Sequence, residues 1–586
     1  MVTLTLSFVF NRSFGRIHSL ACAGFTAIGL SWYASPALGT ELTASSPRYM
    51  VAAADSRAVN AGLAILKAGG SATDAAIAVQ LVLTLVEPQS SGIGGGAFMV
   101  HYDDASNKVT SYDGRETAPG ASTEDLLLTA DGQPMKFFDA VVGGRAVGTP
   151  GVLAMLAMAH AKHGKLPWSE LFHPAIELAN DGFTVSKRLA KMVSGHFGEH
   201  LKTFPETRAY FFPDGKAIQE GQILKNPDFA QTLTAIAKHG AKAFYRGELA
   251  AKIAKTVQNA PNRNGLLSQS DLSVYTAKSR APICYPYRSY RICGMGPPSS
   301  GALTVGQILG ILEEFDMPGL GAKSPLAWHL LAEASKLSFA DRNQFIADTD
   351  FIDTSLEWMI DRSYLADRAT SINPENALKT PVLPGRHCTF ASVGCVPDNS
   401  EKRSGTSHLS IVDGSGNAVS MTTTIEGPFG SFLMTGGFLL NNQLTDFSFA
   451  PKINDVPIAN RVEPGKRPRS SMSPTLVFNS NGTLRLVIGS PGGNRIIGYV
   501  AKTLIAVLDW GLDVQSAIEL GNLVNRNSVT EVEQNTDSEL LRPELEKLGH
   551  RVKVQTMVSG LHGIEIVNGV MRGGADPRRE GIALGR

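Results

Sequence analysis

The chain has 586 residues, of which 43% are hydrophobic and 18% charged, so it can bury a large core or two closely packed halves. Lysine and arginine number 54 and aspartate and glutamate 53. This balance argues against a nucleic-acid or anionic-membrane partner, because such a partner requires a basic excess or patch. No internal repeat is visible, and helical and strand patterns are mixed along the chain.

The N-terminus is typical of an export signal. Two arginines precede a mostly apolar stretch at residues 20–34, and small residues follow at Ala37 and Gly39. We expect a signal peptide over residues 1–39 and a secreted mature protein, periplasmic if the source is Gram-negative. The alternative is a retained anchor, for which the apolar stretch is short. No other long apolar run is present, so no stable membrane insertion is expected.

Four of the five cysteines form two close pairs in the sequence, Cys284 with Cys293 and Cys388 with Cys395. An oxidising compartment would permit two local disulfides, and free thiols are the alternative. No C-x-x-C motif or histidine cluster with metal-ligand spacing is present, so no metal or other cofactor is expected.

The first expected elements are two helices. Asp55 can cap a helix that ends at the glycine pair Gly69-Gly70, with its apolar face formed by Val59, Leu63 and Leu66. Ser71 and Asp74 resemble a capping box that opens a second helix, which runs to Val86 and stops before Pro88.

A glycine-rich loop and further elements follow. Strands are expected at residues 97–102 and 109–114, and helices at 151–163, 169–180, 303–314 and 327–341. Residues 200–280 read as short helices and loops. Residues 381–405 are polar and contain proline, which is the composition of an exposed segment. From His408 onward the chain becomes rich in strands.

A β-hairpin is predicted around the turn 413–417, because residues 407–412 and 418–425 both alternate. If Val412 faces Ala418, Thr406 lies opposite Thr424, and Ser410 and Ser420 share their face. A row of hydroxyls is unusual for a core strand. The simpler alternative is an edge hairpin with a solvated polar face.

The position of Thr406 favours a catalytic interpretation. It follows Gly405 where the polar segment meets the strand. Cleavage of the Gly405–Thr406 bond would give Thr406 a free α-amine, whose pKa near 8 lets it accept the hydroxyl proton at neutral pH. The hydroxyl can first cut its own upstream peptide bond through an N-to-O acyl shift, and a hydrogen bond from Thr424 would orient it.

Acyl transfer also requires an oxyanion site. A strand at residues 483–488 precedes Gly489-Ser-Pro-Gly492-Gly493, and a helix follows. Adjacent glycines at a helix start expose backbone N–H groups to a developing negative charge. The simpler alternative is a tight strand-to-helix turn. A phosphate loop is disfavoured, because no Gly-Lys-Ser/Thr follows.

Together these segments resemble the γ-glutamyltransferase family of N-terminal nucleophile hydrolases over residues 48–581. The similarity is carried by the order and spacing of seven motifs: Val86-Glu-Pro-Gln-Ser-Ser-Gly-Ile-Gly-Gly-Gly96, Gly114-Arg-Glu-Thr-Ala-Pro119, Gly164-Lys-Leu-Pro-Trp168, Gly405-Thr-Ser-His-Leu-Ser410, Leu440-Asn-Asn-Gln-Leu-Thr-Asp-Phe447, Arg467-Pro-Arg-Ser-Ser-Met-Ser-Pro474 and Gly489-Ser-Pro-Gly-Gly493.

The resemblance implies an α+β fold, a four-layer αββα sandwich formed by both halves of a self-cleaved precursor. The large subunit would be residues 40–405 and the small catalytic subunit residues 406–586, and the two would form a heterodimer. It also implies that Thr406 takes the γ-glutamyl group of glutathione or a similar compound as an ester. Water, an amino acid or a short peptide would then accept that group.

The resemblance also implies roles for individual residues. Arg115, Ser470 and Ser471 match the groups that bind the substrate α-carboxylate, and a guanidinium suits that task. Gln443 and Asp446 match the groups that bind the α-ammonium. Gly492 and Gly493 match the backbone oxyanion donors, and Thr424 matches the threonine that touches the nucleophile. Taken singly, each has an ordinary structural alternative, such as a surface ion pair or a turn.

Two features depart from the family. Glu426 stands where many members have asparagine, and it either strengthens ammonium binding or faces elsewhere and alters acceptor choice. The segment 447–466 is shorter than in members with a lid over the site and contains no tyrosine. An open site admits water, so substantial hydrolysis is expected.

Two other functions fit parts of the pattern. A glutaryl or cephalosporin acylase of the same family would act on substrates that lack the α-ammonium. The presence of Gln443, Asp446 and Glu426 argues for an amine in the pocket and therefore against an acylase. A non-catalytic exported binding protein for γ-glutamyl compounds would not require the bond before Thr406 to break.

Overall fold

The computed structural model describes residues 45–46, 48–261, 263–352, 355–385, 396–398 and 405–586. The expected signal peptide and the pair Cys388 and Cys395 lie outside these residues. No helix in the described ranges is long and apolar enough to cross a membrane.

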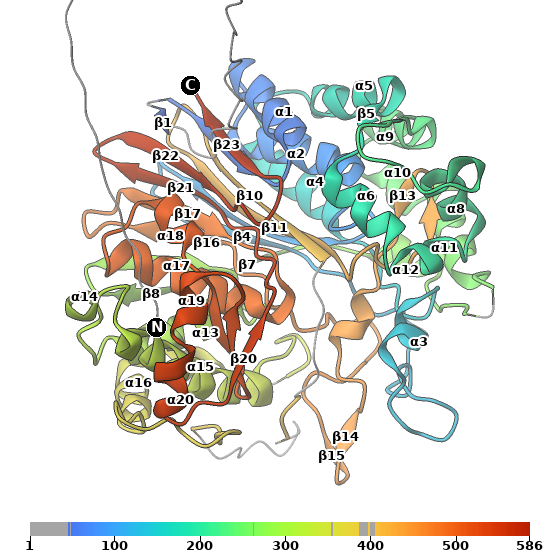
Figure 1. The fold of residues 1–586 in the computed structure, drawn as a ribbon. Helices are drawn as coiled ribbons and strands as arrows, with labels where there is room; N and C mark the ends of the chain where they lie inside the picture. Colours follow the sequence, from blue (N-terminus) through green and yellow to red (C-terminus); the bar gives the residue numbers. More distant parts are fainter. Residues whose placement is uncertain (1–44, 47, 262, 353–354, 386–395, 399–404) are drawn as a thin grey trace, which may run out of the picture. The chain divides into compact units, whose positions relative to one another are not determined.

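Two seven-stranded antiparallel sheets form the centre of the fold (Figure 1). The first, called sheet I, has the order β23 (Ile582–Gly585), β2 (Met50–Ala53), β10 (Gly405–Val412), β11 (Ala418–Glu426), β3 (Gly96–Asp103), β4 (Lys108–Gly114) and β7 (Lys278–Arg280). The second, called sheet II, has the order β1 (Ser45–Ser46), β22 (Val570–Ala575), β21 (His562–Val567), β17 (Leu484–Gly489), β16 (Thr475–Phe478), β9 (Tyr290–Gly294) and β8 (Ile283–Tyr287).

The helices α1 (Ser56–Lys67), α2 (Ala72–Val86) and α4 (Val152–His163) pack on sheet I. The two caps expected for the first helices are present. Asp55 accepts a hydrogen bond from the backbone N–H of Arg57, and Ser71 and Asp74 form a reciprocal capping box. Every residue of α2 is buried, so this helix anchors the sheet that carries β10 and β11.

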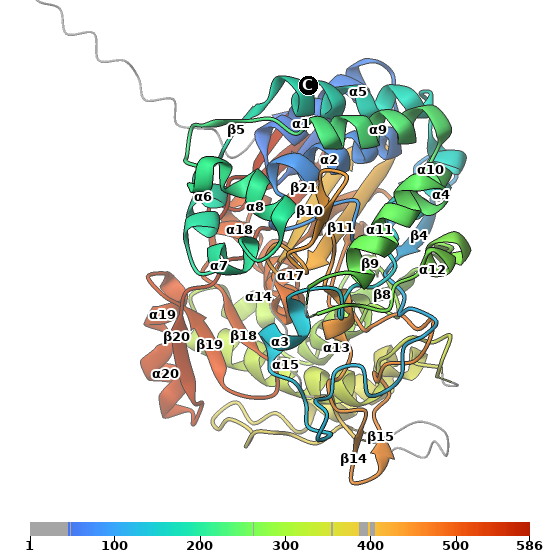
Figure 2. The ribbon, with the colours of Figure 1, turned by 90° about the vertical axis from the view of Figure 1, so that its right-hand side faces the viewer.

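Sheet II is covered by α13 (Gly301–Leu312), α17 (Ile496–Leu508) and α18 (Val514–Glu519). The long helix α15 (Pro325–Phe345) packs against α13. In α17 the apolar residues expected from the sequence, Ile497, Val500, Leu504 and Val507, are all buried. Figure 2 shows the same arrangement after a quarter turn.

The remaining elements surround this centre. They are α3 (Phe137–Val141), α5 (His173–Asp181), α6 (Lys187–Ser194), α7 (Gly198–Leu201), α8 (Pro205–Phe211), α9 (Pro227–His239), α10 (Lys242–Tyr245), α11 (Glu248–Gln258), α12 (Gln269–Val274), α14 (Met317–Leu320), α16 (Arg362–Ala369), α19 (Asp537–Leu540) and α20 (Arg542–Lys547). A three-stranded sheet joins β18 (Leu523–Asn525), β19 (Thr530–Glu533) and β20 (Val552–Gln555). Three short pairs join β5 (Phe183–Thr184) to β6 (Ile223–Leu224), β12 (Met434–Thr435) to β13 (Phe438–Leu439), and β14 (Lys452–Ile453) to β15 (Val456–Pro457).

The hairpin β10–β11 has the predicted register. Thr406 faces Thr424, and Ser410 faces Ser420. The alternative of an edge hairpin is wrong, because β10 also pairs with β2 and β11 with β3, so the hairpin lies inside sheet I.

The row of hydroxyls on this hairpin connects the two sheets. Ser410 Oγ donates to the carbonyl oxygen of His562 on β21, and Ser420 Oγ donates to that of Ile488 on β17, each at 3.0 Å. Leu409 and Ile411, which alternate with these residues, belong to the apolar core shared with α2. Buried hydroxyls need partners, and the carbonyls of the facing sheet supply them.

One of the two expected disulfides is present. Cys284 and Cys293 lie opposite each other on β8 and β9, with their Cα atoms 4.1 Å apart and their sulfur atoms bonded. This bridge links neighbouring strands of sheet II.

Candidate active site

Thr406 lies at the start of β10, where its side chain meets that of Thr424 on β11. The two hydroxyl oxygens are 3.1 Å apart, and both residues are buried. A β-bulge falls between Gly405 and Thr406, because Gly405 pairs with Glu426 while Thr406 pairs with Thr424. The bulge places the Gly405–Thr406 bond at an interruption of the strand ladder.

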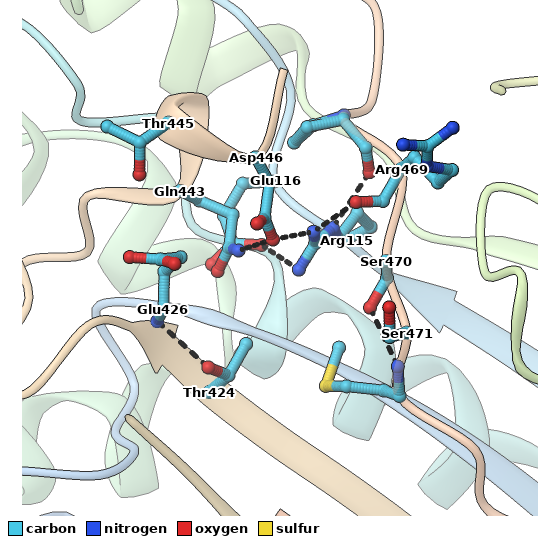
Figure 3. Close-up of polar contacts among 12 residues, drawn as sticks. Arg115, Glu116, Thr424, Glu426, Gln443, Thr445, Asp446, Arg469, Ser470 and Ser471 are labelled. Carbon is cyan, nitrogen blue, oxygen red and sulfur yellow. Dashed lines mark hydrogen bonds and ion pairs between the residues drawn. The ribbon is translucent and has the colours of Figure 1, made fainter. Parts of the chain in front are cut away.

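Thr424 Oγ1 lies at the centre of three contacts. It donates to the carbonyl oxygen of Gly405 at 2.6 Å, accepts from the backbone N–H of Glu426 at 2.8 Å, and lies near Thr406 Oγ1. The contact with the Glu426 N–H is drawn in Figure 3. The Gly405 carbonyl is the group that Thr406 would attack in the self-cleavage expected from the sequence, and in that reaction this donor would polarise the carbonyl.

A small cavity opens beside this pair and is called the catalytic cavity. The space between its walls, including the part open to solvent, is about 290 Å³. Nine of the predicted site residues line it: Arg115, Thr406, Thr424, Glu426, Gln443, Asp446, Ser470, Ser471 and Gly493. Met472, Asn494 and Ile496 complete the lining. The structure therefore brings together residues from both predicted subunits.

Arg115 follows β4 and is held from several sides in the buried wall of this cavity. Its Nε donates to the carbonyl oxygen of Pro468 at 3.1 Å, and one Nη donates to that of Arg469 at 3.2 Å. The same nitrogen lies 2.5 Å from an Asp446 carboxylate oxygen (Figure 3). A guanidinium fixed in this way is preorganised to bind a carboxylate.

Acidic and amide groups face Arg115. Gln443 Nε2 donates to Asp446 at 2.7 Å, and Asn442 Nδ2 donates to the Glu426 carboxylate. Glu426 has φ of 75°, a left-handed conformation that is uncommon for a residue with a side chain. Since Glu426 and Asp446 both line the catalytic cavity, an ammonium group there would meet two carboxylates.

The serine pair directly follows Pro468 and Arg469, whose carbonyls bond to Arg115, and also lines the cavity. Ser470 Oγ accepts from the backbone N–H of Met472 at 3.1 Å. Ser471 Oγ accepts from Arg342 at 2.7 Å and donates to Asn494 Oδ1 at 3.0 Å. Ser471 thus bonds to Arg342, a buried arginine on α15 that was not predicted from the sequence.

The glycine turn after β17 adopts backbone conformations that favour glycine. Gly492 has φ of 143° and Gly493 has φ of 59°. A Cβ atom added to Gly492 would lie 2.6 Å from a Tyr499 ring carbon, so a larger residue does not fit. Among the described residues, neither backbone N–H donates a hydrogen bond to another backbone group. Gly493 lines the catalytic cavity, whereas Gly492 is not among its lining residues.

Glu116 is the most perturbed carboxyl group beside the site. It is fully buried, and its nearest cation is Arg115, whose Nη lies 3.9 Å away. Burial raises the pKa of Glu116 to about 8, although the charge of Arg115 acts in the opposite direction. The carboxyl is therefore mainly protonated at neutral pH.

Arg579 was not predicted from the sequence. Its Nη1 donates to the carbonyl oxygen of Thr406 at 2.8 Å, and it lies 3.9 Å from the Glu87 carboxylate. Glu87 accepts from the Ser407 hydroxyl at 3.3 Å. These groups fix the backbone around Thr406. Glu87 and Ser407 lie in two of the motifs, whereas Arg579 lies in none of them, near the C-terminal end of the sequence.

One group in the described part of the chain has the geometry to hold a metal ion: His329, Glu333 and His550. Its two histidines contact each other, with His329 Nδ1 2.8 Å from His550 Nε2, and the Glu333 carboxylate lies 2.6 Å from Lys336 Nζ. None of the three lines the catalytic cavity. His550 is 221 positions from His329, so sequence spacing did not reveal the group.

Comparison with known proteins agrees with this geometry. The family model described as Gamma-glutamyltranspeptidase matches residues 58–586. The glutathione hydrolase proenzyme of Escherichia coli K12 is 36% identical over 540 residues, covering 90% of each chain. The acylase ACY 1 proenzyme of Pseudomonas sp. V22 is 34% identical over 553 residues, covering 92% of this chain and 94% of its own. The solved structure of a cephalosporin acylase from Bacillus halodurans superposes with a TM-score of 0.82 at 27% identity, covering 95% and 99% of the two chains.

The fold and the cavity define an α+β enzyme with large antiparallel sheets. The chain belongs to the gamma-glutamyltranspeptidase family.

Proposed function

We propose that the chain is a self-processing γ-glutamyl amidohydrolase and acyltransferase that acts on glutathione and related compounds. The observation that carries the proposal is the convergence of Thr406, Arg115 and Asp446 on one cavity. A hydroxyl nucleophile, a fixed cation and a carboxylate match the three functional parts of a γ-glutamyl group: its γ-carbonyl, α-carboxylate and α-ammonium.

The first half of the reaction forms an ester. Once Thr406 is N-terminal, its α-amine accepts the proton of its own hydroxyl, and Oγ1 attacks the γ-carbonyl carbon. The N–H groups of Gly492 and Gly493 stabilise the oxyanion of the tetrahedral intermediate. The C–N bond then breaks, and the leaving amine takes the proton from the α-ammonium of Thr406.

The second half regenerates the enzyme. The α-amine removes a proton from water or from an acceptor amine, which attacks the ester carbon. The C–O bond to Thr406 breaks, and its oxygen recovers the proton. Water yields free glutamate, whereas an amino acid or peptide yields a new γ-glutamyl compound.

Binding of the two charged groups on the substrate α-carbon would bring the γ-amide to Thr406. Arg115 with Ser470 and Ser471 would hold the α-carboxylate. Asp446, Gln443 and Glu426 would hold the α-ammonium, and entry of the substrate would replace the direct Arg115–Asp446 contact with two separate ion pairs. Binding both groups fixes the chain that ends in the γ-carbonyl.

We also propose how the precursor matures. In this proposal, helices, sheet I, sheet II and helices form the four layers of an αββα sandwich of the N-terminal nucleophile hydrolase type. Cleavage before Thr406 would give a large subunit of residues 40–405 and a small subunit of residues 406–586, which stay paired because both contribute strands to both sheets. The signal-like pattern of residues 1–39 supports export of the precursor. Two relatives are named as proenzymes, which supports processing of the precursor.

A second candidate is an acylase that cleaves glutaryl or cephalosporin side chains, which is favoured by the similarity to the acylases. Such substrates lack the ammonium that Asp446 and Glu426 would neutralise. The deciding experiment compares turnover of γ-glutamyl-p-nitroanilide and glutaryl-p-nitroanilide by the purified protein. We expect the γ-glutamyl compound to be preferred, and preference for the glutaryl compound would favour the acylase.

The segment 447–466 bears on the balance of hydrolysis and transfer. It contains the hairpin β14–β15, which projects at the lower edge of Figure 1. None of the residues 447–466 lines the catalytic cavity. We therefore propose substantial hydrolysis. With glutathione and glycylglycine at neutral pH, free glutamate should be a major product, and a large excess of γ-glutamyl-glycylglycine would contradict this.

A further inference from the structure

A second cavity adjoins the catalytic cavity and is called the arginine cavity. The space between its walls, including the part open to solvent, is about 790 Å³. Three arginines line it, Arg342, Arg526 and Arg551, together with Phe339, Asn343, Thr380, Pro381, Asn494, Asn527 and Ser528. Among the described residues, none of those that line it is acidic.

Asn494 belongs to both cavities. It follows Gly493, the residue at which the oxyanion of the proposed reaction would lie. Its Oδ1 accepts from Ser471 Oγ at 3.0 Å and lies 3.4 Å from an Nη of Arg342. The two cavities therefore meet at Asn494, next to Gly493, and the Arg115–Asp446 pair lines only the catalytic cavity.

Arg342 is a buried cation with neutral partners. It is 2% exposed and donates to Ser300 Oγ, Asn343 Oδ1 and Ser471 Oγ at 2.7–2.9 Å. Among the described residues it forms no ion pair, and the carboxylates of Asp398 and Asp446 act on it from farther away. Burial of a charge is costly, and an incoming anion would add to the stabilisation that these two carboxylates give.

The other two arginines add to the positive charge. Arg526 pairs with Glu531 at 2.9 Å, but that carboxylate also pairs with Arg495 at 2.7 Å, so one anion serves two cations. Arg551 is exposed, and its Nη lies 3.3 Å from Thr380 Oγ1. The cavity thus carries an excess of guanidinium groups, which are suited to bind a carboxylate through paired hydrogen bonds.

We propose that the arginine cavity binds a carboxylate on the amine side of the reaction. In the first half-reaction this would be the C-terminal carboxylate of the leaving peptide, and in the second the carboxylate of the accepting amino acid or peptide. The inference rests on the proposed function, because it assigns the amine-side partner of the same catalytic threonine. The substrate class is therefore γ-glutamyl compounds whose amine carries a carboxylate.

The test uses donors that differ only on the amine side. Glutathione carries a C-terminal carboxylate, its C-terminal amide does not, and γ-glutamyl-p-nitroanilide has a neutral leaving group. For the wild type we expect kcat/KM to be about tenfold higher for glutathione than for its amide, as is reasonable for one charge-assisted contact. For Arg551→Gln this preference should fall to about twofold or less, mainly through KM.

Matched controls separate the cavity from the rest of the surface. Arg542→Gln removes an exposed arginine on α20 that does not line the cavity, and it should retain the wild-type preference. Turnover of γ-glutamyl-p-nitroanilide by Arg551→Gln should remain within about twofold of the wild type, which shows that the variant is folded. Arg526→Gln provides a second variant from the same cavity and should lose the same preference.

The outcomes separate this inference from the proposed function. If the wild type turns over γ-glutamyl-p-nitroanilide but treats glutathione and its amide alike, the arginine cavity is not a carboxylate subsite and the proposed function stands. An unchanged preference in both Arg551→Gln and Arg526→Gln would also overturn the inference. If the wild type turns over no γ-glutamyl donor, the proposed function itself fails.

Discussion

The hydroxyl oxygens of Thr406 and Thr424 lie 3.1 Å apart across the β10–β11 pair, and Thr424 Oγ1 also donates to the carbonyl oxygen of Gly405 at 2.6 Å. One hydroxyl thus contacts both the proposed nucleophile and the carbonyl that this nucleophile would first attack. The side chain of Thr424 is therefore placed to assist precursor cleavage as well as substrate turnover.

Replacement of Thr424 by valine tests this double contact. Valine has nearly the same shape but no hydroxyl, so the Gly405 carbonyl loses its donor. We expect precursor cleavage to slow by about 100-fold, the order found when one oxyanion donor is removed elsewhere. The rate is followed as conversion of the single chain into two fragments on a denaturing gel, with Thr422→Val as a control on the same strand. Cleavage at the wild-type rate in Thr424→Val would contradict the assignment.

Replacement of Arg115 by lysine tests carboxylate recognition. Lysine keeps the charge but loses the planar fork and the contacts with the Pro468 and Arg469 carbonyls. We expect KM for γ-glutamyl-p-nitroanilide to rise at least about tenfold, since hydrogen bonds to charged groups are worth about 1.5–3 kcal/mol. Wild-type KM in this variant would show that Arg115 does not hold the substrate.

Replacement of Glu426 by glutamine tests ammonium recognition. The change removes one negative charge from the cavity while keeping an oxygen that Asn442 Nδ2 can reach. We expect kcat/KM for γ-glutamyl-p-nitroanilide to fall about tenfold, whereas that for glutaryl-p-nitroanilide should not fall, because this substrate has no ammonium. Equal losses for both substrates would indicate that Glu426 acts only in packing.

Glu116 should make the stability of the protein depend on pH. Its pKa is raised from 4.5 to about 8 in the folded state because it is buried. Between these values the folded state binds more protons than the unfolded state, so this carboxyl lowers the free energy of unfolding as pH rises from 4.5 to 8. Below pH 4.5 both states are protonated and the group contributes no further change.

Glu116→Gln replaces the carboxyl group by a neutral amide. This change should remove the part of the decrease in the free energy of unfolding that the Glu116 carboxyl causes between pH 4.5 and 8. Relative to the parent, the variant should gain stability as pH rises, by up to about 1.4 kcal/mol per pH unit. Denaturant unfolding from pH 5 to pH 8 measures it, in a Thr406→Ala background that keeps the chain continuous. Parallel stability profiles for the two proteins would contradict a raised pKa for Glu116.

The residues that line the catalytic cavity could be predicted mainly because the order and spacing of short motifs resemble a known family, and only the register of Thr406 and Thr424 came from a local pattern. Alternation around the turn 413–417 determined the hairpin register, and the Cys284–Cys293 pair is only 9 positions apart. The position of the hairpin within sheet I could not be predicted, because neighbours such as β2 and β3 come from far upstream. From the sequence alone, the row of hydroxyls was therefore compatible with an edge hairpin facing solvent. In the structure these hydroxyls donate to backbone carbonyls of sheet II.

The residues that escaped prediction act through tertiary contacts. Arg342 reaches Ser471 from 129 positions away, and Arg579 reaches Thr406 from 173 positions away. Neither belongs to a motif with a local chemical meaning, since an arginine in a helix or a loop is most often a surface residue. Only the folded chain shows that both are buried beside the catalytic cavity.

The most direct test of the account is N-terminal sequencing of the smaller fragment from purified, active wild-type protein. We predict a polypeptide that begins Thr-Ser-His-Leu, and a single uncleaved and inactive chain for Thr406→Ala. An active wild-type protein that contains no polypeptide with this N-terminus would contradict the account, because Thr406 would then lack the free α-amine on which the proposed chemistry depends.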